Sequence, residues 1–482
     1  MAEELKAELC VIGAGAAGLA VAGAAAALGV PVVLIEKGRM GGEHVNTGCV
    51  PSKAMLAAGR RAEAFRASSA FGIEPARPNV VFDEVNDHVH RIINAVGANA
   101  SKERLGALHV RVIEGEARFL DGRTVAVGQG QGGDQDIRYE VTARRFVIAT
   151  GSKPRVPEIS GMDQCSYFTS ETVFEARERP KHLIVIGAGP SGLELAQAFR
   201  RLGSEVTVLE LDRPLADEDP ECAAIVLDAL EREGVTIRSG VKVERVRTLR
   251  QRIEVVLAGD TEETIQGTDL LVTIGRQPNV AGLDLDAARV KHGPSGIVVN
   301  KRFATSNRRV FAIGDVTGLP HSTHSAQHQA ALLIRHILFA LPVTLRVDEI
   351  PRVTFTEPEL AHVGLTEARA RDIYGTVRLL RWPYLDNDRA QAERETRGHI
   401  KVVTDTKGLI LGVTIVGAAA SEQINTWTLA INHALNIRAM ADLVVPYPTY
   451  MEVGKRAAIS FFAPKLSTSW VRRLSGFLRR FG

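Results

Sequence analysis

The sequence predicts an α/β protein that contains two Rossmann-like dinucleotide-binding domains. Two observations support this prediction. An apolar, strand-like run leads into GAGAAG near the N-terminus and another leads into GAGPSG in mid-chain, and an acidic residue ends the strand that follows each motif. The chain has 482 residues, which is enough for about three domains of ~100–200 residues each.

The first glycine motif lies between an expected strand, Glu8–Ile12, and an Ala-rich helix. Glycines at this spacing allow a tight turn, close approach of the backbone to a pyrophosphate, and packing of the helix on the strand. These glycines are Gly13, Gly15 and Gly18. Glu36 ends the next strand, Val32–Ile35, at the spacing that suits hydrogen bonds from a ribose diol.

The second glycine motif repeats this pattern after the expected strand Leu183–Ile186. Its glycines are Gly187, Gly189 and Gly192. Glu210 ends the following strand, and an acidic residue there favours the free 2′-hydroxyl of NAD over the 2′-phosphate of NADP. Arg213 lies close in sequence and favours the opposite choice. We predict that NADH is preferred.

The composition is that of an ordinary globular protein, with 45% hydrophobic and 24% charged residues. A formal net charge of +3 gives no support for nucleic-acid binding. Four cysteines, Cys10, Cys49, Cys165 and Cys222, follow no metal-binding or secreted spacing. The first nine residues lack the apolar segment of a signal peptide, so we expect a cytoplasmic protein.

Gly41–Lys53, which reads GGEHVNTGCVPSK, resembles the redox-active segment of the pyridine nucleotide-disulfide oxidoreductases. That family includes glutathione reductase, lipoamide dehydrogenase, mercuric reductase and the soluble transhydrogenases. Further similar motifs follow in the family's order: Ala149-Thr150-Gly151, Ile274-Gly275-Arg276, Ala312-Ile313-Gly314-Asp315, and a terminal segment at Pro446–Glu452. The resemblance implies FAD in the first dinucleotide fold, NAD(P)H in the second, and an α+β C-terminal dimerisation domain that forms a homodimer.

The resemblance also implies the domain boundaries and the cofactor contacts. The predicted segments are 1–155 and 278–349 for the two parts of the FAD domain, 156–277 for the NAD(P) domain, 350–465 for the dimerisation domain and 466–482 for a basic amphipathic tail. Beyond the glycines and acidic residues above, the expected cofactor-binding residues are Lys53, Ala117, Thr150, Gly151, Gly275, Gly314, Asp315 and His324.

The catalytic residues implied by the resemblance lie on both faces of the flavin. Lys53 and Glu194 would form a buried ion pair beside the ring, where an unpaired charge would be costly. Cys49 would be the thiol on the opposite face. Pro51 suits the first turn of a helix, and a helix N-terminus favours a thiolate.

The chain departs from the family at two positions. His44 holds the place of the first of the family's two cysteines and cannot form a disulfide. Tyr447 holds the place of the acid–base histidine, and a phenol with a pKa of ~10 is a poor base. The soluble transhydrogenases resemble the chain in both respects. The carboxylate partner of that histidine is retained as Glu452. One hypothesis is that Glu452 of the partner subunit orients His44, which then stabilises the Cys49 thiolate or protonates an acceptor; the alternative is a packed histidine.

Three function classes follow. The first, which we prefer, is a flavoenzyme that moves electrons from NADH or NADPH to a small non-disulfide acceptor, such as a nicotinamide nucleotide, a quinone, a metal ion or oxygen. The second is a single-thiol enzyme, similar to lipoamide dehydrogenase or mercuric reductase, in which Cys49 forms a mixed disulfide or sulfenate. The third is a catalytically retired flavoprotein with a regulatory role.

Two further clusters need an interpretation. His321, His324 and His328 resemble a metal cluster, but no cysteine or acidic ligand accompanies them, so we predict no metal site. The tail from Ser469 is basic and amphipathic, and carries Trp470, Leu474, Phe477, Leu478 and Phe481 together with Arg472, Arg473, Arg479 and Arg480. Such a helix lies on an anionic membrane surface or docks on its own dimer.

Overall fold

The structure is a computed structural model that describes residues 2–128, 137–250, 252–259, 263–319, 322–466 and 469–480. The chain forms two compact units. The first consists of Met1–Gly187, Ala198–Leu209 and Val241–Leu345, and the second of Ala188–Gln197, Glu210–Gly240 and Arg346–Gly482. The second dinucleotide-binding fold therefore contributes segments to both units.

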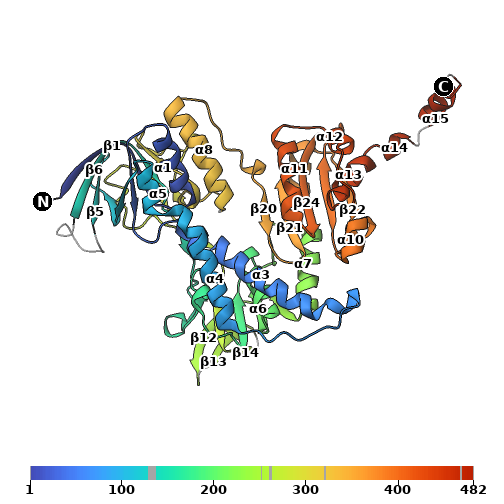
Figure 1. The fold of residues 1–482 in the computed structure, drawn as a ribbon, viewed down its shortest axis with the longest axis horizontal. Helices are drawn as coiled ribbons and strands as arrows, with labels where there is room; N and C mark the ends of the chain where they lie inside the picture. The colour runs from blue at the N-terminus through green and yellow to red at the C-terminus, as the bar shows by residue number, and fades with distance from the viewer. Residues whose placement is uncertain are drawn as a thin grey trace. The chain divides into compact units, whose positions relative to one another are not determined.

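The first unit is built on a mixed seven-stranded sheet (Figure 1). Its strand order is β3 (Arg111–Glu114), β2 (Val32–Glu36), β1 (Glu3–Ile12), β6 (Ile137–Ile148), β5 (Thr124–Gly128) and β4 (Glu116–Phe119), with β19 (Val310–Ala312) paired to β6. The strands β3, β2, β1, β6 and β19 are parallel to one another, whereas β4 and β5 add antiparallel pairs.

The burial of β1 follows from its neighbours. Its first half pairs with β6, and charged side chains such as Glu3 and Glu4 are exposed there. From Leu9 to Ile12 the strand lies between β2 and β6, and all four residues are buried. A parallel strand enclosed on both sides needs an apolar run, which this segment supplies.

Helices cover this sheet and shape the site. The helices α1 (Ala16–Ala27) and α8 (Thr323–Phe339) pack side by side, and their buried residues share a core with β1 and β2 (Figure 1). A second pair is formed by α3 (Cys49–Arg66) and α4 (Phe82–Gly97), with the short helices α2 (Gly42–Asn46) and α5 (Lys102–Ala107) nearby in sequence.

The second dinucleotide fold contains the parallel strands β10 (Glu205–Glu210), β9 (His182–Ile186), β15 (Asp269–Val272) and β8 (Phe168–Thr169), in that order. Its glycine loop leads into α6 (Pro190–Arg201). An antiparallel sheet follows, made of β12 (Val243–Leu249), β13 (Arg252–Leu257) and β14 (Glu263–Gly267). Smaller pairs are β7 (Ser152–Pro154) with β16 (Arg276–Pro278), and β17 (His292–Gly293) with β18 (Gly296–Ile297).

The second unit contains an α+β domain built on a five-stranded antiparallel sheet. Its order is β20 (Arg352–Thr354), β21 (Glu359–Gly364), β24 (Ile410–Gly417), β23 (His399–Thr404) and β22 (Arg378–Pro383). Its other elements are α7 (Pro220–Arg232), β11 (Val235–Ser239), α9 (Glu367–Tyr374), α10 (Asp388–Glu393), α11 (Ala420–Asn432), α12 (Ile437–Asp442), α13 (Met451–Ser460), α14 (Ala463–Leu466) and α15 (Ser469–Leu478). The predicted fold class, two dinucleotide-binding folds and an α+β C-terminal domain, is confirmed.

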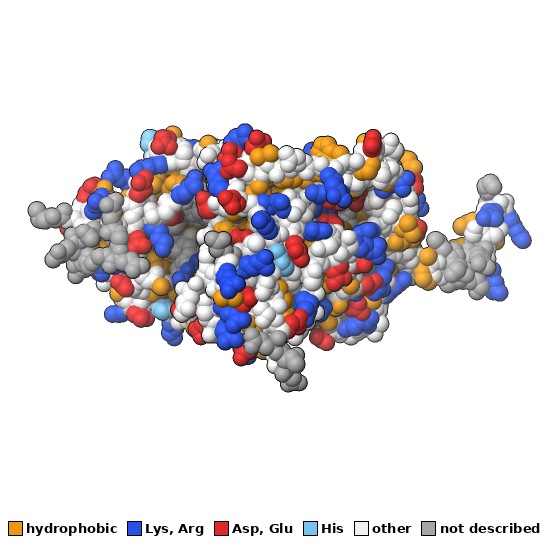
Figure 2. Space-filling view, turned by 90° about the horizontal axis from the view of Figure 1, so that it is seen from below, with side chains coloured by type: hydrophobic (Ala, Val, Ile, Leu, Met, Phe, Trp, Pro, Cys, Tyr) orange, Lys and Arg blue, Asp and Glu red, His pale blue; other side chains and the backbone are white. Residues whose placement is uncertain are grey.

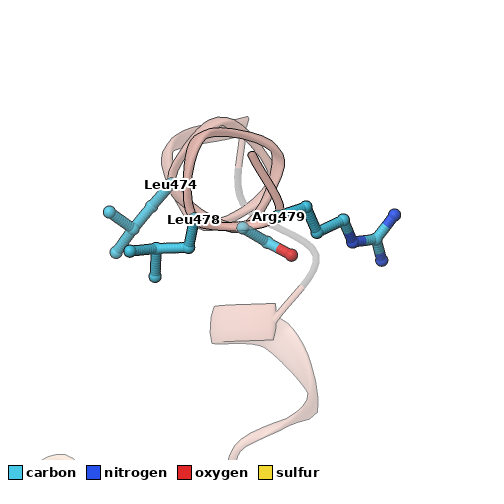
Figure 3. Close-up of a pocket in the computed structure, with 4 residues that line it drawn as sticks. Leu474, Leu478 and Arg479 are labelled. Carbon is cyan, nitrogen blue, oxygen red and sulfur yellow. The ribbon is translucent and has the colours of Figure 1, made fainter. Parts of the chain in front are cut away.

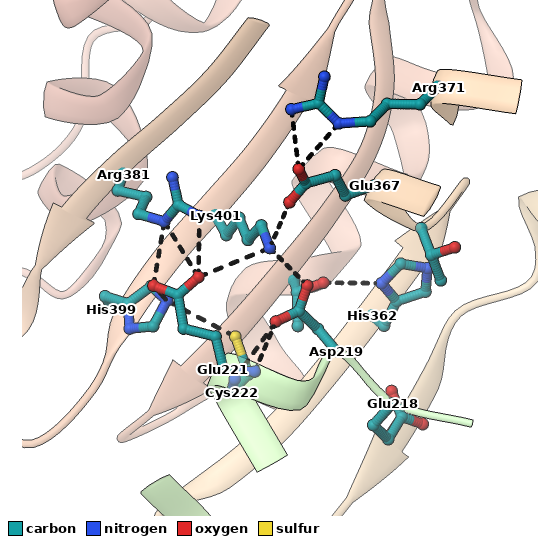
Figure 4. Close-up of polar contacts among 12 residues, drawn as sticks. Glu218, Asp219, Glu221, Cys222, His362, Glu367, Arg371, Arg381, His399 and Lys401 are labelled. Carbon is teal, nitrogen blue, oxygen red and sulfur yellow. Dashed lines mark hydrogen bonds and ion pairs between the residues drawn. The ribbon is translucent and has the colours of Figure 1, made fainter. Parts of the chain in front are cut away.

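A buried polar network fastens two helix N-termini to this sheet (Figure 4). The Nζ atom of Lys401, on β23, lies 2.7 Å from Asp219 and 2.8 Å from Glu367. Asp219 caps α7 by accepting hydrogen bonds from the amides of Glu221 and Cys222, and Glu367 lies in the first turn of α9. The network therefore fixes where α7 and α9 begin.

The surface carries both charges. On the face shown in Figure 2, Lys and Arg side chains are interspersed with Asp and Glu side chains. Among the described residues, no helix combines the length and the apolar character that a membrane crossing requires.

Candidate functional site

The three glycines of the first motif have different surroundings. A Cβ atom on Gly13, whose φ is +101°, would lie 2.4 Å from the carbonyl oxygen of Ala149, and one on Gly18 would lie 1.8 Å from that of Gly13. At Gly15 the nearest atom, the Cα of Gly42, would be 3.9 Å away. Gly13 and Gly18 are thus required for packing, whereas Gly15 leaves room for a ligand to approach the backbone.

The second motif repeats this division. A Cβ atom on Gly187, with φ +104°, would lie 2.6 Å from the carbonyl oxygen of Thr273. Gly189 has no neighbour within 4 Å of such an atom, and Gly192 is buried in α6. The backbone is therefore open to a ligand at the middle glycine in both loops.

The acidic residues that end β2 and β10 also bind the glycine loops. Glu36 accepts hydrogen bonds from the amides of Ala14, at 2.5 Å, and Gly38, at 2.8 Å. Glu210 does the same with Ala188, at 2.7 Å, and Asp212, at 3.1 Å. Sequence reasoning assigned both carboxylates to a ribose only, and their structural role was missed.

The predicted cofactor residues near the strand ends form a hydrogen-bonded set. Thr150 and Asn279 exchange two hydrogen bonds, one from each side chain to the other backbone carbonyl, at 2.8 and 3.0 Å. Gly151, Gly275 and Gly314 all have positive φ, and the amide of Gly314 donates to Gln329 at 2.8 Å. Ala117 is buried in β4, within the sheet core.

Asp315 belongs to a charged cluster that sequence reasoning did not find. The hydroxyl of Ser152 donates to Asp315 at 2.7 Å, and Arg276 donates to Ser152 at 2.7 Å and to Glu171 at 2.6 Å. Arg276 also lies 3.7 Å from Glu43. Burial raises the pKa of Glu43; Arg276 and Lys53 oppose this shift, and Asp315 and Glu171 add to it.

Cys49 occupies an exposed position at the start of α3, with Gly48 as the N-cap. Its Sγ atom lies 3.3 Å from the Oγ1 atom of Thr323, the first residue of α8. The other cysteines, Cys10, Cys165 and Cys222, are buried, and none of the four forms a disulfide. Burial raises the pKa of Cys10 and Cys222, so these thiols are poor nucleophiles.

His44 lies half-buried on α2, and burial lowers the pKa of its imidazole. The ring is therefore neutral near pH 7, so it can accept a proton but supplies no positive charge. The predicted pairing of His44 with Glu452 of the partner subunit stays a prediction.

Lys53 and Glu194 fall in different units. Lys53 is half-buried in the second turn of α3. Glu194 is 4% exposed on α6, where it accepts a hydrogen bond from the amide of Phe355 at 2.9 Å. Their ion pair stays a prediction.

Tyr447 is 70% exposed, and its hydroxyl donates to Asp388 at 2.7 Å. This hydrogen bond raises the pKa of Tyr447, which makes the phenol an even poorer base than expected. Glu452 lies in the first turn of α13. Asp388 follows β22 and gave no signal in the sequence.

The structure describes two of the three histidines that the sequence groups near α8. His324 and His328 lie on α8, and the Nε2 atom of His324 is 3.2 Å from the hydroxyl of Ser322. His321 lies outside the described residues. Among those that are described, no group of three His, Cys, Asp or Glu side chains is placed to hold a metal ion.

Comparisons with known proteins agree with this architecture. A family model described as pyridine nucleotide-disulphide oxidoreductase matches residues 7–330, and the dimerisation-domain model of that family matches residues 350–458. A mercuric reductase from Streptomyces lividans is 35% identical and spans 97% of this chain and 98% of its own length. A dihydrolipoyl dehydrogenase from Bacillus subtilis is 30% identical and spans 94% and 98%.

A solved structure is similar over almost the whole chain. It is the Cu(II) complex of the HOCl-induced flavoprotein disulfide reductase RclA from Escherichia coli. The TM-score is 0.85 at 25% identity, with 94% of this chain and 99% of the other covered.

Proposed function

This chain belongs to the pyridine nucleotide-disulphide oxidoreductase family, and we propose that it delivers electrons from NADH to a small acceptor that is not a disulfide. Members of this family are FAD-dependent enzymes that take their electrons from NAD(P)H. The dimerisation domain makes the protein a homodimer. The proposal concerns the acceptor, the choice of NADH and the absence of dithiol chemistry.

The residues of the first dinucleotide fold fit FAD. The N-cap of α1 is Gly15, which offers no side-chain cap, and the first turn carries no acidic residue, so its amides are left for a pyrophosphate. Glu36 and Asp315 are half-buried acceptors that would hold ribose and ribityl hydroxyls. When bound, FAD supplies a ring that accepts a hydride from the nicotinamide and releases electrons to an acceptor.

The observation that carries the proposal is that Cys49 is the one exposed cysteine among the four described. A dithiol relay needs a second sulfur beside it, and His44 holds that place. The burial of the remaining three cysteines also supports a site without a disulfide. Tyr447, hydrogen-bonded to Asp388, is a poor replacement for the base that thiol–disulfide exchange requires.

Metal ions are the acceptors to test first. Thiolate and imidazole groups bind soft and borderline ions, and Cys49 and His44 supply these two groups in one segment. The names of the similar proteins include mercuric reductase and a Cu(II) complex of RclA. A metal ion would be a passing substrate. Quinones, a second nicotinamide nucleotide and oxygen are the other candidates.

The choice of NADH is supported by the surroundings of Glu210. Its carboxylate stays at the end of β10, bound to the loop amides, where a 2′-phosphate would meet a negative charge. The guanidinium of Arg213 donates to the carbonyl oxygens of Ala216 and Glu218. Arg213 is therefore occupied by its own loop. We expect kcat/KM to be at least about tenfold higher with NADH than with NADPH, a difference of ~1.4 kcal/mol.

Anaerobic titration of the purified flavoprotein with NADH tests the proposal. We expect uptake of two electrons per flavin, followed by turnover with a quinone or dye that survives Cys49→Ala. The matched control is His44→Cys, which restores the two-cysteine spacing and should raise the uptake to four electrons. Uptake of four electrons by the unaltered protein would contradict the proposal.

The alternative is a single-thiol enzyme in which Cys49 forms a mixed disulfide or a sulfenate. The exposure of Cys49 at a helix N-terminus favours this reading, because a thiolate is stabilised there. In that case Cys49→Ala loses turnover with every acceptor, while the reduction of the flavin by NADH continues.

We also propose that α15 lies on an anionic membrane surface. Leu474, Phe477 and Leu478 are 40%, 55% and 57% exposed. Leu474, Leu478 and Arg479 line a pocket on α15, and the Arg479 side chain extends to the side of the helix opposite the two leucines (Figure 3). Arg473 and Arg480 add to its positive charge. Flotation with vesicles that contain phosphatidylglycerol should recover the full chain and not a variant that ends at residue 468. Equal recovery with neutral phosphatidylcholine vesicles would refute the electrostatic part.

A further inference from the structure

Cys49 and Thr323 are 274 residues apart in sequence, yet their side chains meet. The Sγ atom of Cys49 lies 3.3 Å from the Oγ1 atom of Thr323. Cys49 is the first residue of α3, which has 18 residues, and Thr323 is the first residue of α8, which has 17. The sulfur therefore lies at the N-termini of two long helices, where negative charge is stabilised.

The hydroxyl of Thr323 is not required to cap its own helix. Ser322 is the N-cap of α8, and its hydroxyl accepts a hydrogen bond from the amide of Ser325 at 3.2 Å. The N-cap of α3 is Gly48, which has no side chain to offer. The Thr323 hydroxyl can therefore donate a hydrogen bond to the neighbouring sulfur. Because Thr323 is half-buried, fewer water molecules compete for this hydrogen bond.

We propose that Thr323 is a positioning residue that donates a hydrogen bond to the Cys49 thiolate and so keeps this sulfur ionised and aligned. A thiolate has no proton, so in the ionised state the hydroxyl must be the donor. A hydrogen bond to a charged acceptor is stronger than one to a neutral thiol, and it therefore favours ionisation. The inference rests on the proposed function only in treating Cys49 as the thiol of the flavin site.

Titratable groups close in sequence to Cys49 or Thr323 lie on α3, on α8 and on the preceding helix α2. They are Glu43 and His44 on α2, Lys53 on α3, and His324 on α8. All four are kept in the variants described next. A shift between these variants therefore measures the Thr323 hydroxyl.

The test is the rate at which iodoacetamide alkylates the native flavoprotein between pH 5 and pH 9.5. Labelling should be selective for Cys49, because Cys10, Cys165 and Cys222 are buried, and a Cys49→Ser variant gives the background. For Thr323→Val we expect the midpoint of the rate profile to rise by about half to one pH unit. The rate below both midpoints then falls about three- to tenfold, and the alkaline plateau is unchanged. Thr323→Ser keeps a hydroxyl and should stay within about twofold of the unaltered protein.

Three results would overturn the inference. The first is a Thr323→Val profile that coincides with that of the unaltered protein. The second is a Thr323→Ser variant as slow as Thr323→Val, because the hydroxyl would then be irrelevant. The third is a lower alkaline plateau with an unchanged midpoint, which would mean that Thr323 controls access to the sulfur. If Thr323→Val does not fold, Thr323→Ala takes its place. Alkylation needs neither NADH nor an acceptor, so this result is independent of the proposed function.

Discussion

Replacing Lys401 by methionine should destabilise the C-terminal domain strongly. Lys401 is 5% exposed. Its ammonium group lies 2.7 Å from Asp219, 2.8 Å from Glu367 and 3.5 Å from Glu221 (Figure 4). Methionine fills a similar volume, so the loss is mainly that of the positive charge. Asp219 would remain buried without it.

The size of the expected loss of stability depends on the partners that each carboxylate retains without Lys401. Glu367 retains Arg371, and Glu221 retains Arg381. Asp219 is 6% exposed and retains only backbone donors among the partners described here, so most of the cost falls on it. Breaking a buried ion pair by removing one partner costs about 3–5 kcal/mol, and we expect about 3 kcal/mol because two carboxylates keep an arginine.

A double variant separates charge from packing. Asparagine at position 219 can still accept the hydrogen bonds that cap α7, but it carries no charge. We therefore expect Asp219→Asn to recover part of the loss caused by Lys401→Met, which leaves a net cost of about 1–2 kcal/mol. Additive losses in the double variant would refute the reasoning, as would an unchanged midpoint in Lys401→Met.

The assay is urea unfolding followed by tryptophan fluorescence at fixed protein concentration, with FAD in excess. All three tryptophans, Trp382, Trp427 and Trp470, lie in the C-terminal part of the chain, so the signal reports on this domain. Fixed concentration is needed because the protein is a dimer. An unchanged m-value is needed to convert the midpoint shift into a difference in the free energy of unfolding.

The difference between the unaltered protein and Lys401→Met should depend on pH. Burial works against ionisation of Asp219, but the hydrogen bond from Lys401, the charge of Lys401 and the hydrogen bonds from the backbone amides together outweigh it and lower the pKa. The same lysine lowers the pKa of Glu367. A carboxylate with a lowered pKa stabilises the fold above its unfolded value, ~4, and this contribution disappears as the pH falls through the folded value. The difference should therefore be complete at pH 7 and shrink below about pH 4.

Other residues give further tests. Gly18→Ala should destabilise the FAD-free protein, because the added methyl group would overlap the carbonyl oxygen of Gly13 in the same loop. Gly15→Ala should change the stability of the FAD-free protein by less than about 0.5 kcal/mol but should weaken FAD binding. Thermal unfolding measures the stability, and flavin fluorescence titration measures the FAD binding. Tyr447→Phe should change the rate of turnover with a non-disulfide acceptor by less than about twofold at every pH from 6 to 9, because the hydrogen bond to Asp388 raises the pKa of this phenol. If the variant lost the alkaline limb of the pH–rate profile, the phenol would be catalytic. Burial lowers the pKa of His362 to about 3, so stability should fall as the pH drops below ~6.5, by up to ~1.4 kcal/mol per unit from this residue, and urea midpoints in His362→Gln should lack this slope.

Sequence reasoning succeeded where structure is decided locally. Gly13 and Gly187 adopt positive φ next to a strand end, and this conformation leaves glycine as the ordinary choice. The acidic residues at Glu36 and Glu210 recur at a fixed distance from the loops, which reveals a repeated unit. The strand expected at Glu8–Ile12 in fact begins at Glu3, because the polar N-terminal half pairs with β6 only.

Sequence by itself also determined that Cys49 has no cysteine at the family's spacing, because His44 occupies that place. Only the tertiary structure decided what surrounds Cys49. The fold brings Thr323 into contact with Cys49, 274 positions away, and Lys401 into contact with Asp219, 182 positions away. Spacing along the chain carries no record of such contacts. The shifted pKa values of Glu43 and His44 likewise depend on burial, which many distant segments create together.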